Sequence, residues 1–176
     1  MSPSPSLPLQ EPNTQIKFFK RGTILQNKEE VHLKAFYIKK GLVRSYTIDS
    51  KGKQHIFMFA PEEWIIGDIE AYQYNHPTEL FIDCLEDTEL IRLKIDHLNG
   101  DQLSHDQLKK NLHLLGRRVG LLQRRVLMLM SATASERYAL FLKDYPDLPN
   151  RIPQYMIASY LGITPEALSK IRSQKT

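Results

Sequence analysis

The chain has 176 residues, of which 41% are hydrophobic and 25% charged, enough for one sizeable domain or two small ones with an apolar core. Its single cysteine, Cys84, excludes an internal disulfide framework and any zinc or iron–sulfur site built from several cysteines of one chain. No apolar run is long enough to cross a membrane, and the N-terminus lacks the basic start and apolar core of a secretory signal. We therefore expect a cytoplasmic protein without a membrane partner.

The distribution of charge is more informative than the formal net charge of +4. The first 100 residues hold 12 Lys and Arg against 14 Asp and Glu, whereas residues 151–176 hold four against one. Residues 101–130 are also basic, with six against two. A polyanionic partner should therefore meet the C-terminal part of the chain.

Residues 1–13 contain four prolines and three serines, and they are predicted to form a flexible arm. The following region, 14–100, alternates short apolar runs with turn signals. The runs are Ala35–Ile38, Leu42–Ile48, His55–Phe59, Leu80–Leu85 and Leu90–Leu93, and Asp49–Gly52 has the composition of a hairpin turn. Runs rich in β-branched and aromatic residues at about ten-residue spacing predict an antiparallel β sandwich or barrel.

A heptad repeat follows, and it predicts one long helix over about 102–130 within a segment 101–130. Its apolar positions alternate spacings of four and three residues: Leu108, Leu112, Leu115, Val119, Leu122, Val126 and Leu129. Such a seam favours a partner helix, for which a second copy of the chain is the simplest source. The alternative is a helix buried against its own domain. Arg117, Arg118, Arg124 and Arg125 lie off the seam and are expected to keep the opposite face in solvent.

The last segment, 131–176, predicts a further helix over Ser135–Tyr145, capped by Ser131 or Thr133, a loop over Pro146–Asn150, and then two helices joined by a tight turn. Pro153 suits a first helical turn, Gly162 suits a left-handed helix end, and Thr164 with Pro165 suits the start of the next helix. Met156, Ile157, Tyr160, Leu161, Leu168 and Ile171 form the inner apolar side. These signals together predict a helix-turn-helix.

The outer side of this motif carries side chains suited to a DNA major groove. Lys and Arg bind guanine edges or phosphates, Glu accepts from cytosine, and Ser can do either. The predicted DNA-binding residues are Gln154, Tyr155, Thr164, Pro165, Glu166, Ser169, Lys170 and Arg172. A solvated helix corner without a ligand is the plainer alternative.

The order of these parts resembles the Crp/Fnr family of regulators, which includes the catabolite activator protein. The resemblance is strongest in Ala158–Arg172, and it extends to Phe19–Leu25, Phe36–Arg44 and Trp64–Asp68. It implies an α+β fold: an antiparallel β roll of the cyclic-nucleotide-binding type, a long dimerisation helix, and a C-terminal helix-turn-helix with a reduced wing. It also implies that Glu166 and Lys170 read bases, while Pro165 replaces a frequent arginine.

The resemblance is weaker at the positions that bind cyclic nucleotides in this family. A Gly–Glu pair and a downstream Arg–Ser or Arg–Thr are replaced by Gly67–Asp68 and by Thr78–Glu79, without an arginine, and Leu122 and Gln123 stand where hydroxyl groups are offered to adenine. An added glutamate repels a cyclic phosphate. We therefore expect a degenerate effector pocket over Gly67, Asp68, Thr78, Glu79, Leu122 and Gln123, no cofactor, and no control by cyclic AMP.

The sequence thus predicts a homodimeric transcription regulator that binds double-stranded DNA at a pseudo-palindrome. RNA polymerase and an unknown small-molecule effector, or none, stay open as further partners. The alternative is a ligand-binding β-roll module whose C-terminal helices bind a protein. An enzyme, such as a cupin-like metal oxygenase, is not expected, because His32, His55 and His76 are scattered and form no His-x-His pair.

Overall fold

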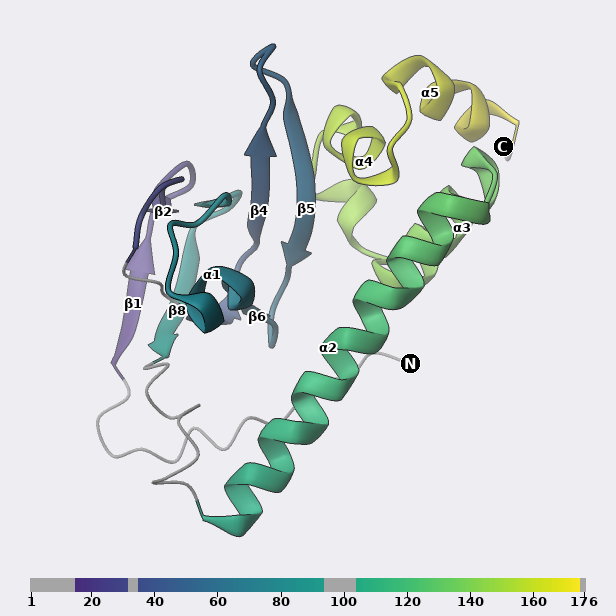
Figure 1. Cartoon of the computed structure of the whole chain (residues 1–176). Coiled ribbons are helices and arrows are strands. Elements are labelled where there is room, and N and C mark those ends of the chain that lie inside the picture. The colour runs from purple at the N-terminus through teal and green to yellow at the C-terminus, as the bar shows by residue number, and fades with distance from the viewer. Residues whose placement is uncertain (1–14, 32–34, 94–103, 175–176) are drawn as a thin grey trace. The chain divides into compact units, whose positions relative to one another are not determined.

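A computed structural model describes residues 15–31, 35–93 and 104–174 of the chain (Figure 1). The arm predicted over residues 1–13 lies outside these ranges. The chain divides into two compact units, residues 1–99 and 100–176, which we call the β unit and the helical unit and describe separately.

Two four-stranded antiparallel sheets form the described part of the β unit, in the strand orders β1-β8-β3-β6 and β2-β7-β4-β5. The strands are β1 (Ile16–Phe19), β2 (Ile24–Gln26), β3 (Ala35–Lys40), β4 (Val43–Ile48), β5 (Gln54–Ala60), β6 (Ile65–Ile66), β7 (Phe81–Cys84) and β8 (Thr88–Leu93), with a short helix α1 (Ile69–Tyr74) after β6. All five predicted apolar runs coincide with strands, and the antiparallel β roll is confirmed. The strands β1, β2 and β6 and the helix α1 were not predicted from the sequence.

The hairpin between β4 and β5 forms where Asp49–Gly52 predicted it. The Asp49 carboxylate accepts from the backbone N–H groups of Lys51 and Lys53 at 2.9 and 3.0 Å, and Gly52 has a φ of +78°. A short polar side chain that bonds its own turn and a glycine that tolerates positive φ together close the loop.

The core of the β unit lies between the two sheets. It contains buried side chains from both sheets, and Phe19 and Trp64 pack against it while partly exposed. The buried members are Leu25, Phe36, Ile38, Val43, Ala60, Ile66, Ile82, Cys84 and Leu90.

The helical unit begins with the predicted long helix, α2 (His105–Ser131), and continues with α3 (Ala134–Asp144), a 3₁₀ turn (Leu148–Asn150), α4 (Gln154–Leu161) and α5 (Pro165–Ser173). Thr133 caps α3: its hydroxyl accepts from the Glu136 N–H, and the Glu136 carboxylate accepts from the Thr133 N–H. This reciprocal pair decides between the two predicted caps, Ser131 and Thr133, and starts the helix one residue before the predicted Ser135. The loop predicted over Pro146–Asn150 contains the 3₁₀ turn. Residues 104–174 contain no strand.

Within the described ranges, every helix falls short of the length or the hydropathy that a membrane-spanning segment requires.

Candidate nucleic-acid interface

The two C-terminal helices meet at a turn that is closed by hydrogen bonds between residues near in sequence. Gly162 ends α4 in the left-handed region, with φ +66°. Its N–H donates to the Ser159 carbonyl at 3.2 Å, and the Ile163 N–H donates to the Ala158 carbonyl at 3.0 Å. These two bonds form a Schellman motif. The Thr164 hydroxyl then accepts from the Ala167 N–H at 3.2 Å and caps α5, with Pro165 in the first turn. The predicted helix-turn-helix is therefore present.

Pro153 occupies a different position from the predicted one. It is the N-cap of α4, with ψ +145°, and the first helical residue is Gln154. A proline fits either position, because neither requires an N–H donor within the helix.

The inner side of the motif is buried as the apolar pattern predicted. Ile157, Ala158, Leu161 and Leu168 are completely buried. Met156, Tyr160 and Ile171 are at most 9% exposed. The small Ala158 side chain lets the two helices approach closely. One side of α5 is thus fixed against α3 and α4, and its orientation is set by packing.

The outer side of the motif is open to solvent. Seven of the eight predicted DNA-binding residues are exposed: Gln154, Tyr155, Thr164, Pro165, Glu166, Ser169 and Lys170; Arg172 is half-buried. The N–H of Glu166 and the hydroxyl of Thr164 lower the pKa of the Glu166 carboxyl, so it is ionised at neutral pH and can accept hydrogen bonds. The exposed side of α5 therefore offers one anionic acceptor and a cationic donor, Lys170, one helical turn apart.

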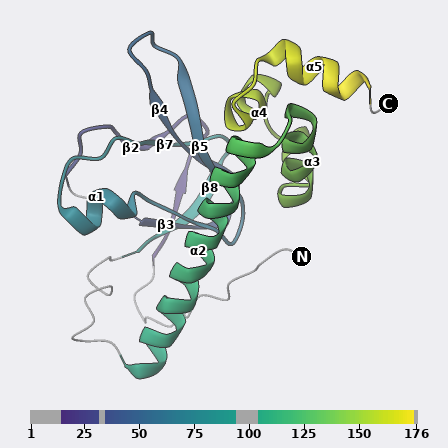
Figure 2. The ribbon, with the colours of Figure 1, turned by 45° about the vertical axis from the view of Figure 1, so that its right-hand side comes forward.

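We call α3, α4 and α5 the reading head, which follows the C-terminal end of α2 (Figure 1 and Figure 2). Two arginines join it to that end of α2. Arg137 in α3 donates to backbone carbonyls of Leu129, Ala132 and Leu161 at 2.8, 3.0 and 3.1 Å. Arg125 in α2 donates to the Tyr160 carbonyl at 3.2 Å, and its guanidinium lies 3.9 Å from the centre of the Tyr160 ring.

The expectation that Arg125 keeps a face of α2 in solvent is therefore wrong, because this side chain is half-buried against α4. Arg124 is exposed, Arg118 is half-buried, and the side chain of Arg117 lies outside the described part of the structure. The role of Arg137 was not predicted from the sequence. Two of its partners, Leu129 and Ala132, shortly precede it in the sequence, but the third, Leu161, lies 24 positions away, and no sequence pattern indicates that contact.

Most of the heptad seam on α2 is uncovered in the single chain. Leu112 is 71% exposed, and Leu108, Leu115, Val119 and Val126 are between 43% and 56% exposed. Leu122 and Leu129 are half-buried. A Leu129 methyl carbon lies 3.5 Å from the point where a side chain at Gly162 would begin, so Leu129 packs on the turn of its own chain. Met130, its neighbour, is 78% exposed.

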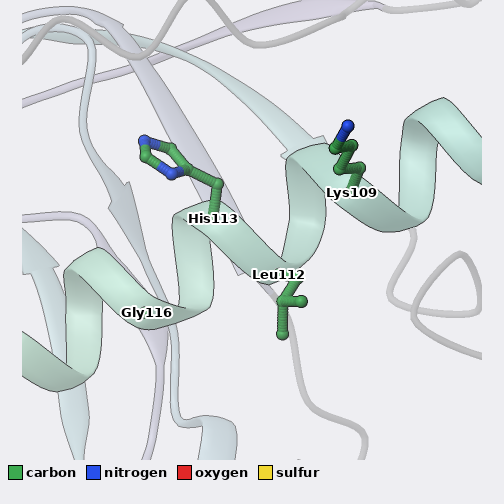
Figure 3. A pocket seen from close by; sticks show the side chains of 4 residues that line it. All are labelled: Lys109, Leu112, His113 and Gly116. Atoms are coloured by element: carbon green, nitrogen blue, oxygen red, sulfur yellow. The ribbon is translucent and has the colours of Figure 1, made fainter.

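An open hollow of about 520 Å³ lies along the N-terminal half of α2 (Figure 3). The described residues that line it are Lys109, Leu112, His113 and Gly116, all from this one helix. Residues from a single helix do not enclose a ligand, so the hollow does not by itself define a binding site.

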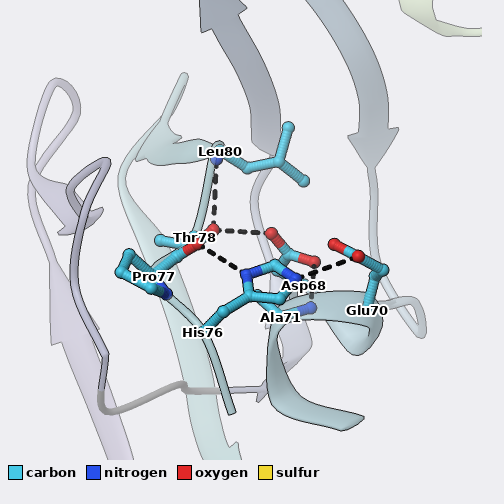
Figure 4. Close-up of polar contacts among 7 residues, drawn as sticks. All are labelled: Asp68, Glu70, Ala71, His76, Pro77, Thr78 and Leu80. Carbon is cyan, nitrogen blue, oxygen red and sulfur yellow. Dashed lines mark hydrogen bonds and ion pairs between the residues drawn. The ribbon is translucent and has the colours of Figure 1, made fainter. Parts of the chain in front are cut away.

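Two of the predicted effector residues, Asp68 and Thr78, are joined by a hydrogen bond within a small polar network of the β unit (Figure 4). Asp68 caps α1: its Oδ1 accepts from the Ala71 N–H at 3.2 Å, while its Oδ2 accepts from the Thr78 hydroxyl at 2.6 Å. Thr78 is completely buried, and its oxygen also accepts from Gln26 Nε2 and from the Leu80 N–H. Each carboxylate oxygen of Asp68 thus accepts one hydrogen bond from the protein itself.

The other predicted effector residues differ in their surroundings. Gly67 is buried, whereas the Glu79 carboxylate is 72% exposed and forms an ion pair with Lys28 at 2.9 Å. That ion pair raises the pKa of Lys28. Beside them, the Glu70 carboxylate and the Pro77 carbonyl raise the pKa of His76. Leu122 and Gln123 lie on α2, half-buried and exposed respectively, in the helical unit.

No family model matches the chain. It is 26% identical over 148 residues to the "Anaerobic regulatory protein" of Haemophilus influenzae, and the match covers 77% of this chain. The chain spans 57% of the length of this curated relative.

Solved structures share the fold. FixK2 from Bradyrhizobium japonicum superposes with a TM-score of 0.77 at 20% identity, covering 92% of this chain and 84% of the other. A transcriptional regulator of the CRP/FNR family from Thermus thermophilus superposes with a TM-score of 0.71 at 17% identity, covering 91% and 84%. Two of these three proteins are named as regulators. In the order of its elements and in its fold, the chain resembles the regulators of the Crp/Fnr family, as its sequence predicted.

Proposed function

We propose that the chain is a sequence-specific DNA-binding transcription regulator that acts as a homodimer on a pseudo-palindromic site. The observation that carries this proposal is the geometry of α5. Its inner side is buried against α3 and α4, and its outer side presents Glu166, Ser169 and Lys170 to solvent. A capped and packed helix holds these side chains in a fixed orientation, as a reader of base edges requires.

The residue types suit direct readout in the major groove. Lys170 can donate to guanine O6 or N7, the ionised Glu166 can accept from cytosine N4, and Ser169 can do either. Pro165 cannot donate, so the position where related regulators often carry arginine adds no base contact here. The base-reading set is therefore short, and phosphate contacts must supply much of the affinity.

The exposed seam of α2 supports a homodimer. Leucine and valine at alternating spacings of three and four residues are costly to leave in water, and a second α2 covers them in the geometry of a two-stranded coiled coil. Two reading heads carried on such a pair would meet half-sites about 34–36 Å apart.

We propose further that cyclic AMP does not control this regulator. A cyclic phosphate needs a cation or N–H donors, and residues 75–80, where related regulators carry an arginine, contain none. The nearby Lys28 is paired with the Glu79 carboxylate at 2.9 Å, so a phosphate would have to compete with that carboxylate for the cation. Site selection in the presence and absence of saturating cyclic AMP should therefore recover the same sites with equal affinity.

The test of the main proposal is selection of binding sites from a random duplex library without added ligand. Recovery of a pseudo-palindrome, with an affinity that falls steeply as salt rises, is the expected result. Recovery of no sequence, together with capture of a protein by a contact that salt does not weaken, would favour the alternative of a protein-binding module.

Substitutions in α5 test which of its side chains contact the bases. Lys170→Ala should relax preference at one base position by about 1–3 kcal/mol. Lys143→Ala removes the same charge from an exposed position on α3 and is the matched control. Equal sequence preference in both variants would contradict the assignment of α5 as the recognition helix.

Substitutions in α2 test the homodimer. Leu112→Lys together with Val119→Lys should give monomers by light scattering, because both side chains are more than half exposed in the single chain and their replacement leaves its own packing intact. A dimer that persists would show that another surface joins the two copies.

A further inference from the structure

The C-terminal ends of α2 and α4 both have backbone carbonyl groups that need hydrogen-bond donors from outside their own helix. The last four carbonyl groups of a helix have no partner within that helix. Arg137 supplies donors to both ends at once, with one nitrogen on the Leu129 carbonyl of α2, one on Ala132 just after α2, and one on the Leu161 carbonyl of α4. One guanidinium therefore links the end of α2, the residue Ala132 that follows it, and the end of α4.

Arg125 adds a second link to the same junction. It reaches from α2 to the Tyr160 carbonyl of α4, and its charged plane rests on the Tyr160 ring, whose centre is 3.9 Å away. The Tyr160 ring is itself held by the rings of Phe141 and Tyr145, at centroid distances of 5.6 and 5.9 Å. Arg125 is thus seated on a buried aromatic cluster of the reading head.

We infer that Arg137, assisted by Arg125, is a positioning residue that fixes the reading head at one angle to α2. This inference rests on the proposed function: in a dimer joined through α2, that angle sets the separation of the two recognition helices. The arginines would select the spacing between half-sites and leave the choice of bases to Glu166 and Lys170.

The chemistry of the side chain explains why arginine is required. A guanidinium is planar and rigid and directs five N–H donors into a fork, so it can hold three carbonyl groups in fixed relative positions. A lysine ammonium at position 137 keeps the charge but is a compact point on a flexible stem, and it cannot span the same three oxygens. Lysine should preserve the fold and lose the fixed angle.

Gly162 lies at the same junction. A side chain added there would begin 3.5 Å from Arg137 Nη1 and 3.5 Å from a Leu129 methyl carbon. The turn of the helix-turn-helix therefore lies directly against the arginine and against the end of α2, and a change of angle at α2 would displace the turn.

The first experiment uses the full-length protein without DNA. Spin labels are placed on cysteines at the exposed positions Gln123 in α2 and Ser173 in α5, with Cys84 replaced by alanine, and labelled protein is diluted with unlabelled protein so that distances within one chain dominate. The wild-type background should give one narrow distance distribution. Arg137→Lys and Arg137→Met should broaden it at unchanged helix content.

Arg124→Met is the control, because Arg124 is an exposed arginine of α2, next to Arg125. It should leave the distribution narrow. If Arg137→Met prevents folding, Arg137→Lys and Arg125→Lys carry the test. A distribution as narrow in Arg137→Lys as in the wild type would overturn the inference, whether or not the protein binds DNA.

The second experiment measures affinity for duplexes in which the selected half-sites are moved apart or together by one or two base pairs. The wild type and Arg124→Met should prefer one spacing by about tenfold or more, because simultaneous engagement of both half-sites depends on geometry. Arg137→Lys should lose most of that preference while its preferred bases stay the same. Retention of the full spacing preference would refute the positioning role, whereas absence of DNA binding by the wild type would refute the proposed function and leave the first experiment as the test of the junction.

Discussion

The β unit contains a buried ion pair, and breaking it should strongly reduce the free energy of unfolding. Arg44 in β4 and Asp83 in β7 stand opposite each other in register, and the guanidinium donates to both carboxylate oxygens at 2.8 and 2.9 Å. The two side chains are only 8% and 12% exposed. Arg44 also donates to Gln54 at 2.9 Å and lies 4.2 Å from the centre of the Tyr46 ring.

Arg44→Met should therefore leave a buried carboxylate without a charged partner. Removing one member of a buried pair costs about 3–5 kcal/mol of unfolding free energy. At a urea dependence of about 2 kcal/mol per molar, that loss lowers the midpoint by about 2 M. The double variant, Arg44→Met with Asp83→Leu, should recover much of the loss, because two apolar side chains leave no buried charge.

Tryptophan fluorescence is a suitable assay, because the chain's one tryptophan, Trp64, packs against the core of the β unit and reports on that unit. Lys20→Met is the control. It breaks an ion pair of equal length to Asp87 whose side chains are 74% and 50% exposed, and a solvated pair adds little to stability. A loss below about 1 kcal/mol in Arg44→Met, or a double variant less stable than the single one, would refute this account of the pair.

Three further predictions follow from single residues. Burial raises the pKa of the Cys84 thiol to about 11, so alkylation in the native protein at pH 8 should be slow and should become fast on unfolding in urea; rapid native labelling would contradict the buried placement. His76 should titrate above its ordinary value of 6.5, and Glu70→Gln should lower that pKa, as followed by NMR; the resulting stability is present below about pH 6.5 and is lost as pH rises through the raised pKa, and an unchanged titration in Glu70→Gln would show that the ion pair is absent in solution. Gly41→Ala should lower the urea midpoint more than Gly52→Ala, because both glycines have positive φ but only at Gly41 would the added carbon meet a backbone oxygen, at 2.7 Å; equal midpoints would indicate that the loop relaxes freely.

The parts of the fold that could be predicted are those with local signals. Gly162 ends one helix, and Thr164 and Pro165 start the next. The hydrogen bonds at this turn span at most five residues, so the residue types alone predict it. The apolar side of α4 and α5 and the long heptad of α2 are equally local, because each follows the period of its own helix.

The remaining features depend on partners that are distant in sequence. β6 has two residues, and its pairing with β3 gives it regular structure. The partners Arg44 and Asp83 are 39 positions apart, and Arg125 and Tyr160 are 35 apart. A sequence pattern predicts that charged side chains are exposed to solvent. The burial of an arginine can therefore be recognised only when the positions of the surrounding strands and helices are known.

The end of α2 shows how one pattern can serve two contacts. A straight helix drifts by about 20° per heptad from a seam of strict seven-residue period. Over the length of α2, this drift turns Leu129 toward Gly162 of its own chain and leaves Met130 78% exposed. The heptad alone assigns Leu129 to a partner helix, whereas its burial assigns it to the reading head. The same two turns carry Arg125 and the Leu129 carbonyl that Arg137 binds, so these residues join the head to α2, while Leu112, Leu115, Val119, Val126 and Met130 remain exposed. In the proposed dimer, a rotation of one α2 against the other would therefore be transmitted to the recognition helix without a flexible joint between them.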